Sequence, residues 1–280
     1  MSGNALKKLG IDTLDANPKV GVLVRLSPKQ FLQIKKQLQP ILADLGDPGF
    51  WRSGGAGSFD PEHRFAKKGT TKIDSGDVDV FVDTNNIKGA LGLPEDAEDK
   101  AVRVALAKYM SEQFPTLQIG KNVHVGLPTG DEIEGLPTYF QVDLMTMANA
   151  HDIGRHHEHD YSVKDTPYKG VDQQLALSSL VNTIPGHPPR TFQYDGFGGA
   201  LKDRSTGQVI THDIDKIAEL VLGPGHNSDS LGNAESIISA VGGINSPRLA
   251  QFRDDMAKKG MNLAEGTVDW FKSIRSKLAI

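Results

Sequence analysis

The chain has 280 residues, a formal net charge of -4 and no cysteine; 38% of its residues are hydrophobic and 24% are charged. This size suits one large domain or two small ones, and the acidic balance argues against a protein that coats nucleic acid by bulk charge. The lack of cysteine excludes disulfides, catalytic thiols and thiolate zinc sites.

The sequence also carries information about location. It contains no run of about 18 apolar residues, so we expect no membrane-spanning helix and no membrane partner. The first residues, MSGNALKKLGID, lack the apolar core of a signal peptide. The absence of cysteine is compatible with a reducing compartment. We therefore expect a cytoplasmic protein.

The first predicted elements are a weak strand and a long helix. Apolar residues alternate over 20–26, which indicates a strand. The sequence SPKQ at 27–30 is typical of a helix start, with Ser as the cap, Pro in the first turn and Gln three residues after the cap. Helical spacing continues to Leu45, and Pro40 is expected to kink or split the helix. A short strand at 50–52 follows.

The stretch 53–83 carries the residues on which the functional hypothesis depends. It begins with the glycine-rich turn GGAGS, continues through a loop at 59–74 and ends in an apolar strand at 78–82. Asp77 and Asp79 share one face of that strand, about 7 Å apart along it, because side chains alternate in a strand. Two such carboxylates repel each other, and a divalent metal ion is their natural partner.

The rest of the chain divides into a mixed part and a mostly helical part. Strands are expected at 117–127 and 139–145, joined by a polar turn at 128–137, and short strands are expected around a Ser-Thr-Gly turn at 205–207. The expected helices are 96–114, 171–184, 213–222, 229–241, 247–259 and 267–279. We place the domain boundary between 1–150 and 151–280.

A third aspartate, Asp143, lies on the apolar strand at 139–145 and joins the acidic pair only if the two strands are neighbours. The glycine turn allows close approach of the backbone to an anion, and Ser58 adds a hydroxyl group. Carboxylates with two metal ions roughly 3.5–4 Å apart, next to an anion-binding turn, are typical of phosphoryl or nucleotidyl transfer. The simpler alternatives are an exposed strand face and an ordinary turn.

Together these motifs resemble a known superfamily. Gly57-Ser58, the later Gly69-Thr70, the sequence SGDVDV at 75–80 and the third aspartate resemble the polymerase-β-type nucleotidyltransferases. Their order is most similar to the branch with archaeal CCA-adding enzymes, oligoadenylate synthetases and bacterial cyclic-nucleotide synthases. The resemblance covers roughly residues 50–145. It implies an α+β fold, with a nucleotidyltransferase-like mixed sheet flanked by helices, followed by a mostly helical C-terminal domain that closes the nucleotide cleft.

The resemblance also implies roles for individual residues. Asp77 and Asp79 would bind both metals, Mg²⁺ or Mn²⁺, and Asp143 would complete the second metal site and act as, or orient, the base. Gly57 and Ser58 would hold the triphosphate of a nucleoside triphosphate. The expected partners are this nucleotide and an RNA or nucleotide acceptor.

The sequence departs from the superfamily pattern at an insert, 59–67, and at Gly76, which stands in place of a polar residue. Basic residues in and after the insert could grip phosphates or form a solvated loop, and both interpretations stay open. These residues are Arg64, Lys67, Lys68 and Lys72.

Two further groups are candidates. Ser162, Tyr168 and Lys169 precede the helix at 171–184, where they could bind a triphosphate tail or a stacked base, or simply be solvated. The second group is a histidine cluster, which either binds zinc near the active site or is a solvated polar segment. Its members are His151, His156, His157 and His159.

The sequence therefore predicts a metal-dependent nucleotidyltransferase. It would move a nucleoside monophosphate from a nucleoside triphosphate to a hydroxyl of an RNA 3′ end, a nucleotide or a protein, with release of pyrophosphate. One alternative is a catalytically silent module of the same fold, used for binding or assembly. Another is a toxin or antiviral nucleotidyltransferase that acts on tRNA or a partner protein.

Overall fold

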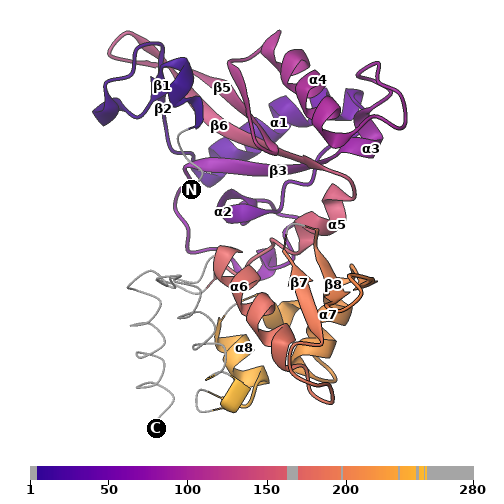
Figure 1. Cartoon of the computed structure of the whole chain (residues 1–280). Helices are drawn as coiled ribbons and strands as arrows, with labels where there is room; N and C mark the ends of the chain where they lie inside the picture. The colour runs from indigo at the N-terminus through magenta and orange to yellow at the C-terminus, as the bar shows by residue number, and fades with distance from the viewer. Residues whose placement is uncertain are drawn as a thin grey trace. The chain divides into compact units, whose positions relative to one another are not determined.

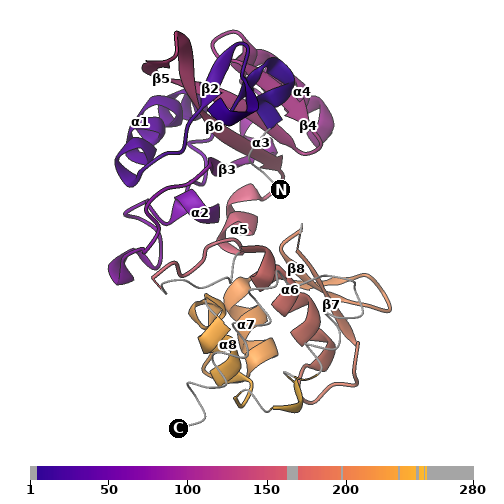
Figure 2. The same cartoon turned by 90° about the vertical axis from the view of Figure 1, so that its left-hand side faces the viewer.

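The computed structural model describes residues 5–162, 170–196, 198–232, 234–243, 246–248 and 250. The chain divides into two compact units, Met1–Glu158 and His159–Ile280, and each is described by itself (Figures 1 and 2). The predicted helix at 267–279 and almost all of that at 247–259 lie outside the described residues. Within the described ranges, no helix combines the length and apolarity needed to cross a membrane.

The first unit is an α+β unit with a mixed six-stranded sheet flanked by helices. Its strands are β1 (Ile11–Asp12), β2 (Gly21–Leu23), β3 (Asp77–Asp83), β4 (Thr116–Ile119), β5 (Asn122–Ile133) and β6 (Leu136–Met147). Its helices are α1 (Pro28–Asp44), α2 (Gly54–Gly57), α3 (Thr84–Ile87), α4 (Asp99–Ser111) and α5 (Ala150–Arg155), with 3-10 turns η1 (Ala5–Leu9), η2 (Leu14–Ala16) and η3 (Ala66–Lys68).

Strand β6 is the centre of this sheet. The antiparallel strand β5 pairs along one edge of β6 and carries β4 beyond it. Along the other edge, β2 pairs with 138–139 and β3 with 141–147, both in parallel. The register of the β3–β6 pair sets Asp79 directly opposite Asp143. This pairing is the condition on which the sequence-based hypothesis of one acidic site depended.

The two faces of the sheet differ in chemistry because side chains alternate along each strand. One face of β3 and β6 is apolar and packs against α1 and α4 in the main core, whereas the opposite face carries the aspartates. In Figure 1, α1 and α4 lie on one side of β3, and α2 and α5 lie on the other. The strand and helix residues at the centre of this core include Val78, Val80, Val142, Leu144, Phe31, Ile34, Leu38, Val102 and Leu106.

Helix α1 begins as the sequence predicts. The Ser27 hydroxyl accepts a hydrogen bond from the Gln30 N–H, and the Gln30 side chain accepts one from the Ser27 N–H, which forms a capping box. The helix then runs without interruption through Pro40, so the predicted split is wrong. Pro40 and Lys36 are both exposed, so water can reach the Lys36 carbonyl that the proline leaves without a donor.

Three predicted strand boundaries are also wrong. The single strand at 117–127 is a hairpin that turns at 120–121, between β4 and β5. The turn predicted at 128–137 consists of only two residues, Glu134 and Gly135. Their positive φ angles of 53° and 77° let these two residues alone reverse the chain. The strand at 50–52 is only an isolated bridge between Phe50 and Phe81.

The insert at 59–67 is anchored in the protein interior. Phe59 is buried and meets Phe31 of α1 edge to face, with 6.1 Å between the ring centres. Asp60 is also buried and accepts a hydrogen bond of 2.7 Å from the Lys35 ammonium group. The first half of the insert therefore belongs to the core and is not an open recognition loop.

The second unit contains helices and a small sheet. Its described elements are α6 (Gly170–Leu180), η4 (Val181–Thr183), β7 (Phe192–Asp195), β8 (Ala200–Asp203), β9 (Val209–Thr211), α7 (Ile214–Leu222), η5 (Ser228–Leu231) and α8 (Ala234–Ala240). The three strands form an antiparallel sheet, and the predicted turn at 205–207 joins β8 to β9. The mostly helical character of residues 151–280 stays a prediction.

A buried carboxylate, Asp47, ties several elements of the first unit together. It accepts hydrogen bonds from the N–H groups of Gly49 and Asp83 and lies 2.8 Å from His151 Nε2. Burial alone would raise the pKa of Asp47, but the hydrogen bonds from His151, Gly49 and Asp83 outweigh burial and lower it. The hydrogen bond to Asp47 raises the pKa of His151.

This pair predicts a pH-dependent stability. The raised pKa of His151 means that its contribution is complete below about pH 6.5 and is lost as the pH rises through the folded-state pKa. Asp47 stays ionised throughout this window. Because the imidazole is partly exposed, we expect the wild type to lose at most about 1 kcal/mol relative to H151Q between about pH 5.5 and pH 9. Urea unfolding at both pH values measures this difference, and a constant difference would contradict the prediction.

Candidate active site

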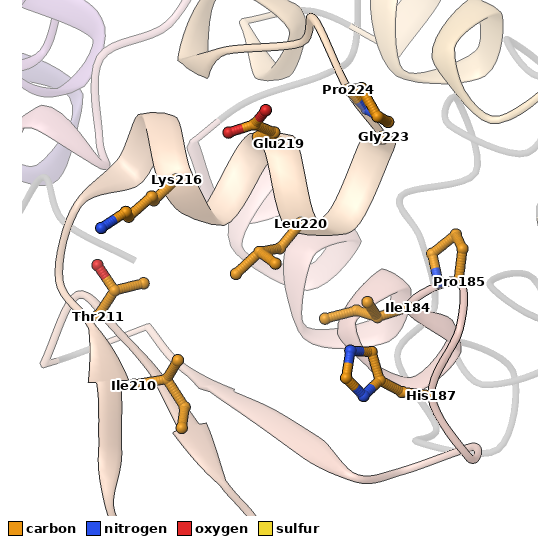
Figure 3. A pocket seen from close by; sticks show the side chains of 10 residues that line it. All are labelled: Ile184, Pro185, His187, Ile210, Thr211, Lys216, Glu219, Leu220, Gly223 and Pro224. Carbon is orange, nitrogen blue, oxygen red and sulfur yellow. The ribbon is translucent and has the colours of Figure 1, made fainter.

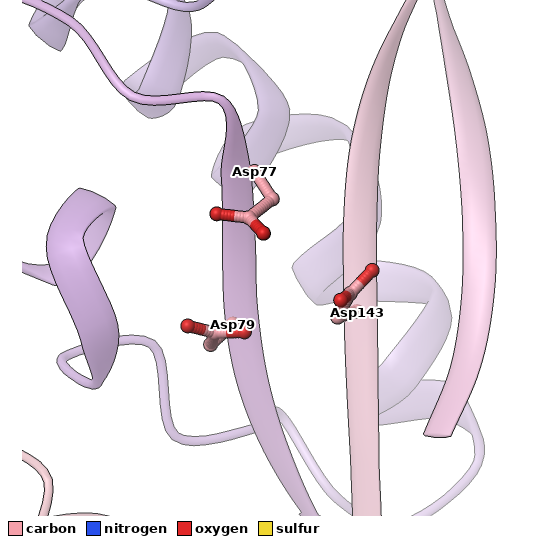
Figure 4. Close-up of side chains that lie close together, drawn as sticks. All are labelled: Asp77, Asp79 and Asp143. Carbon is pink, nitrogen blue, oxygen red and sulfur yellow. The ribbon is translucent and has the colours of Figure 1, made fainter. Parts of the chain in front are cut away.

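Three aspartates meet on one face of the sheet in the first unit. Asp77 and Asp79 lie on β3, and Asp143 lies opposite Asp79 on β6. One carboxylate oxygen from each aspartate lies within 4.8 Å of the others. Figure 4 shows the three side chains, which project from two neighbouring strands toward a common space. We call these residues the acidic triad; Asp143 is buried and the other two are half-buried.

The local sequence explains this placement. In β3 the aspartates alternate with Val78 and Val80, whose side chains enter the core and fix which face of the strand is buried. In β6, Val142 and Leu144 flank Asp143 and do the same. The apolar face of each strand therefore fixes the position of the acids on the other face.

The surroundings of Asp79 strongly raise its pKa. Burial, followed by the negative charges of Asp77 and Asp143, raises the pKa of Asp79 to about 8, although the positive charge of Lys72 opposes this. A carboxyl group with such a pKa is held in an environment that favours an added positive charge. A divalent cation would supply that charge.

The ligand set fits a hard divalent cation. The triad offers only carboxylate oxygens, which Mg²⁺ and Mn²⁺ prefer, and no nitrogen or sulfur ligand. Three oxygens within 4.8 Å of one another can reach a shared ion. The residues present therefore fit the Mg²⁺ or Mn²⁺ expected from the sequence, although the identity of the ion stays a prediction.

The glycine-rich turn forms α2, one turn of helix that packs against β3. Gly54 has a φ of +65°, and a Cβ at this position would lie 2.1 Å from Asp79 Oδ2. At Gly55 a Cβ would lie 2.1 Å from the Lys72 ammonium nitrogen. Gly54 requires glycine, because its positive φ disfavours any side chain and a Cβ would displace Asp79. At Gly55 a side chain would have to move the flexible end of Lys72. Gly54 therefore borders the acid Asp79, whereas the sequence-based choice was Gly57.

Gly57 and Ser58 have local partners. A Cβ on Gly57 would lie 2.3 Å from the carbonyl carbon of Arg52, so this glycine allows the backbone to pack on itself. The Ser58 hydroxyl donates to the Gly55 carbonyl oxygen and accepts from the Thr70 hydroxyl, at 2.9 and 3.2 Å. The Gly-Ser and Gly-Thr motifs are thus adjacent in space. Their contact with a nucleotide stays a prediction.

The remaining nucleotide-binding candidates are Ser162, Tyr168 and Lys169. Ser162 belongs to the second unit, where its hydroxyl and N–H both donate to Asp160 Oδ1. Tyr168 and Lys169 lie outside the described residues. The predicted role of all three in nucleotide binding therefore stays a prediction.

The histidine cluster fits neither sequence-based alternative. His151 bonds to Asp47, His156 is buried, and the ring of His157 lies 5.1 Å from that of Phe81. These histidines pack within the first unit, so the interpretation as a solvated segment is wrong. Among the described residues, no group of three metal ligands in mutual reach contains a histidine, so the zinc interpretation has no support there.

The basic residues around the insert separate into three kinds. Arg64 is part of the structure: its guanidinium donates to the Glu158 carbonyl oxygen and lies 4.7 Å from the Phe65 ring centre. Lys67 and Lys68 are exposed. Lys72 extends over Gly55 toward the acids, as its effect on the pKa of Asp79 indicates. Lys72 is therefore the insert-region cation best placed for a phosphate bound at the triad.

Two residues next to Asp143 were not predicted from the sequence. His124 on β5 and Gln141 on β6 both place a side-chain nitrogen 2.8 Å from Asp143 Oδ1. A signal for Gln141 was available, because it lies two residues before Asp143 and therefore shares its face. His124 could not have been found, because its pairing with Asp143 depends on the β5–β6 register.

A separate cavity of about 490 Å³ lies in the second unit between β9 and α7. In Figure 3, Ile184, Ile210 and Leu220 converge from three segments onto its apolar part, and Lys216 and Glu219 are its charged members. No member of the acidic triad lines this cavity.

Comparisons with known proteins give no further guide to the site. The sequence matches no family model and none of the curated proteins with which it was compared. The resemblance to nucleotidyltransferases therefore rests on the motifs alone.

The electrostatics predict that D79N stabilises the metal-free protein. A carboxyl pKa raised from its usual value to about 8 means that the folded state binds a proton that the unfolded state has lost. Its contribution to stability therefore falls as the pH rises across that range. We expect D79N to raise the free energy of unfolding by about 1–2 kcal/mol near pH 8 and by less near pH 5.

The matched control is D131N, which removes an equal charge from an exposed position in the β5–β6 hairpin. Chemical denaturation of wild type and both variants in the presence of a chelator measures the effect. A D79N variant that is less stable than the wild type near pH 8, with D131N unchanged, would contradict the predicted repulsion.

Proposed function

We propose that this protein is a metal-dependent nucleotidyltransferase of the polymerase-β type. It moves a nucleoside monophosphate from a nucleoside triphosphate to a hydroxyl acceptor and releases pyrophosphate. The adjacent parallel strands β3 and β6, which bring Asp77, Asp79 and Asp143 together on one face, are the observation that carries this proposal. The contact between the Gly-Ser and Gly-Thr motifs beside that face supports it.

The proposal assigns the negative charge of the triad to cation binding. Asp77, Asp79 and Asp143 would hold Mg²⁺ or Mn²⁺, which when bound would activate the acceptor hydroxyl and offset the charge of the leaving pyrophosphate. The raised pKa of Asp79 supports this assignment. Three carboxyl groups so close together destabilise the folded protein, and such a cost is typical of functional sites.

The groups around the triad would then orient the nucleotide. Gly54 and Gly55 bring the backbone against Asp79 and Lys72, so backbone N–H groups and the Lys72 ammonium group lie where a triphosphate would bind. The Ser58 hydroxyl donates to the Gly55 carbonyl oxygen and accepts from Thr70, so it would donate to the triphosphate by turning its proton away from Gly55. The insert helps to fix this turn, because Phe59 and Asp60 fasten the chain immediately after Ser58.

The reaction would be a single displacement at phosphorus. The acceptor hydroxyl oxygen bonds to the α-phosphorus, and the bond from that phosphorus to the bridging oxygen breaks. The hydroxyl proton moves to a carboxylate of the site, which the resemblance assigns to Asp143. Pyrophosphate leaves with the electron pair of the broken bond.

The direct test is incubation of the protein with each labelled nucleoside triphosphate and Mg²⁺ or Mn²⁺, with and without total RNA. We expect pyrophosphate release with at least one nucleotide and a decrease of about 10³-fold or more in D79A. The D131N variant serves as the matched control and should keep wild-type activity, because Asp131 lies in the exposed hairpin. Wild-type pyrophosphate release by folded D79A would refute the proposal.

The labelled product also identifies the acceptor. Labelled RNA, labelled protein and a free labelled oligonucleotide each correspond to one branch of the proposal, including a toxin or antiviral enzyme that acts on tRNA or a partner protein. A titration of Mg²⁺ or Mn²⁺ with a non-hydrolysable nucleotide that shows no metal-dependent nucleotide binding would instead favour the silent module.

A further inference from the structure

We propose that His124 and Gln141 are positioning residues that hold one oxygen of Asp143 and so present its other oxygen to the catalytic cation. This inference rests on the proposed function, because it assigns Asp143 to the metal site. It extends that function to two residues on strands β5 and β6 that do not belong to the acidic motif.

The contacts are specific to one atom. His124 Nδ1 and Gln141 Nε2 each lie 2.8 Å from Asp143 Oδ1. His124 approaches from the neighbouring strand, where it is directly opposite Asp143, and Gln141 approaches from two residues earlier on the same strand. With two donors on Oδ1, the carboxylate plane is fixed, and Oδ2 is the oxygen left for a cation.

The chemistry of the two donors defines their orientation. An ionised carboxylate only accepts hydrogen bonds, so His124 must carry a proton on Nδ1 and the Gln141 amide must turn its nitrogen toward Asp143. All three side chains are buried, with 7%, 0% and 1% of His124, Gln141 and Asp143 exposed. Buried charge-assisted hydrogen bonds of this kind hold a side chain in one rotamer.

Gln141 gives a second, independent indication of a ligand at this site. Within the described part of the chain, its carbonyl oxygen Oε1 is buried without a hydrogen-bond partner. The amide cannot flip to satisfy this oxygen, because the flip would point Oε1 at the Asp143 carboxylate. Gln141 is also directly opposite Asp77 in the β3–β6 register, so it shares the face of the triad. A cation or a water bound to it would satisfy Oε1.

The experiment measures the affinity of the full chain for Mn²⁺ alone, by calorimetry and by electron paramagnetic resonance of the free ion. We expect H124L and Q141M, which remove the donors at similar side-chain volume, to weaken Mn²⁺ binding about 10- to 100-fold. H124N keeps an N–H donor near the position of Nδ1 and should stay within about threefold of the wild type. Thermal unfolding without metal verifies that each variant is folded.

A double-mutant cycle separates positioning from general damage. In a D143N background, H124L should change Mn²⁺ affinity less than twofold. The asparagine already lacks the carboxylate oxygen that His124 is proposed to present to the cation. Equal losses in both backgrounds would overturn the inference, and so would unchanged affinity in folded H124L and Q141M.

The proposed function and the positioning role can be tested independently of each other. If the wild type binds Mn²⁺ but releases pyrophosphate from no nucleotide, the proposed reaction fails, while the Mn²⁺ affinities of the variants still decide the positioning role. If the wild type binds no Mn²⁺ at the triad, both proposals fail.

Discussion

The parallel pairing of β3 with β6 is the constraint on which the rest of the site depends. Its register places Asp79 opposite Asp143 and Gln141 opposite Asp77, so that three carboxyl groups and one amide share a face. This arrangement opposes folding, as the pKa of about 8 for Asp79 indicates. It is maintained because the valines on the other face of the same strands are fully buried in the main core.

The surroundings of the triad are built to keep it in place. Gly54, with its positive φ, leaves room for Asp79 Oδ2, and Gly55 leaves room for the Lys72 ammonium group. His124 and Gln141 hold Asp143 from two directions. Under the proposed function, this ordering would lower the cost of ligand binding and favour catalysis by preorganised charge.

Prediction from the sequence was most accurate where local patterns decide the structure. The capping box of α1 and the shared face of Asp77 and Asp79 follow from residue spacing alone, and both are present. The prediction was wrong at 120–121, where a tight turn interrupts the alternation predicted as one strand, and at 128–137, where the predicted polar turn is only Glu134-Gly135. Alternation of apolar residues is the same on both sides of a two-residue turn, so it cannot show where a hairpin reverses. The sequence left open whether the basic residues at the insert grip phosphates or form a solvated loop, and it did not indicate that Phe59 and Asp60 are buried against α1.

The sequence by itself determined the acidic pair on one strand, the glycine turn before it and an apolar setting for the third aspartate. These features depend on neighbours within a few residues, and short-range geometry fixes them. The tertiary structure alone decided that Asp143 joins the pair, that Gly54 rather than Gly57 borders Asp79, and that His124 faces Asp143. Each of these depends on the register between strands or on the contact of a loop with a strand, and neither is encoded in the spacing of residues along the chain.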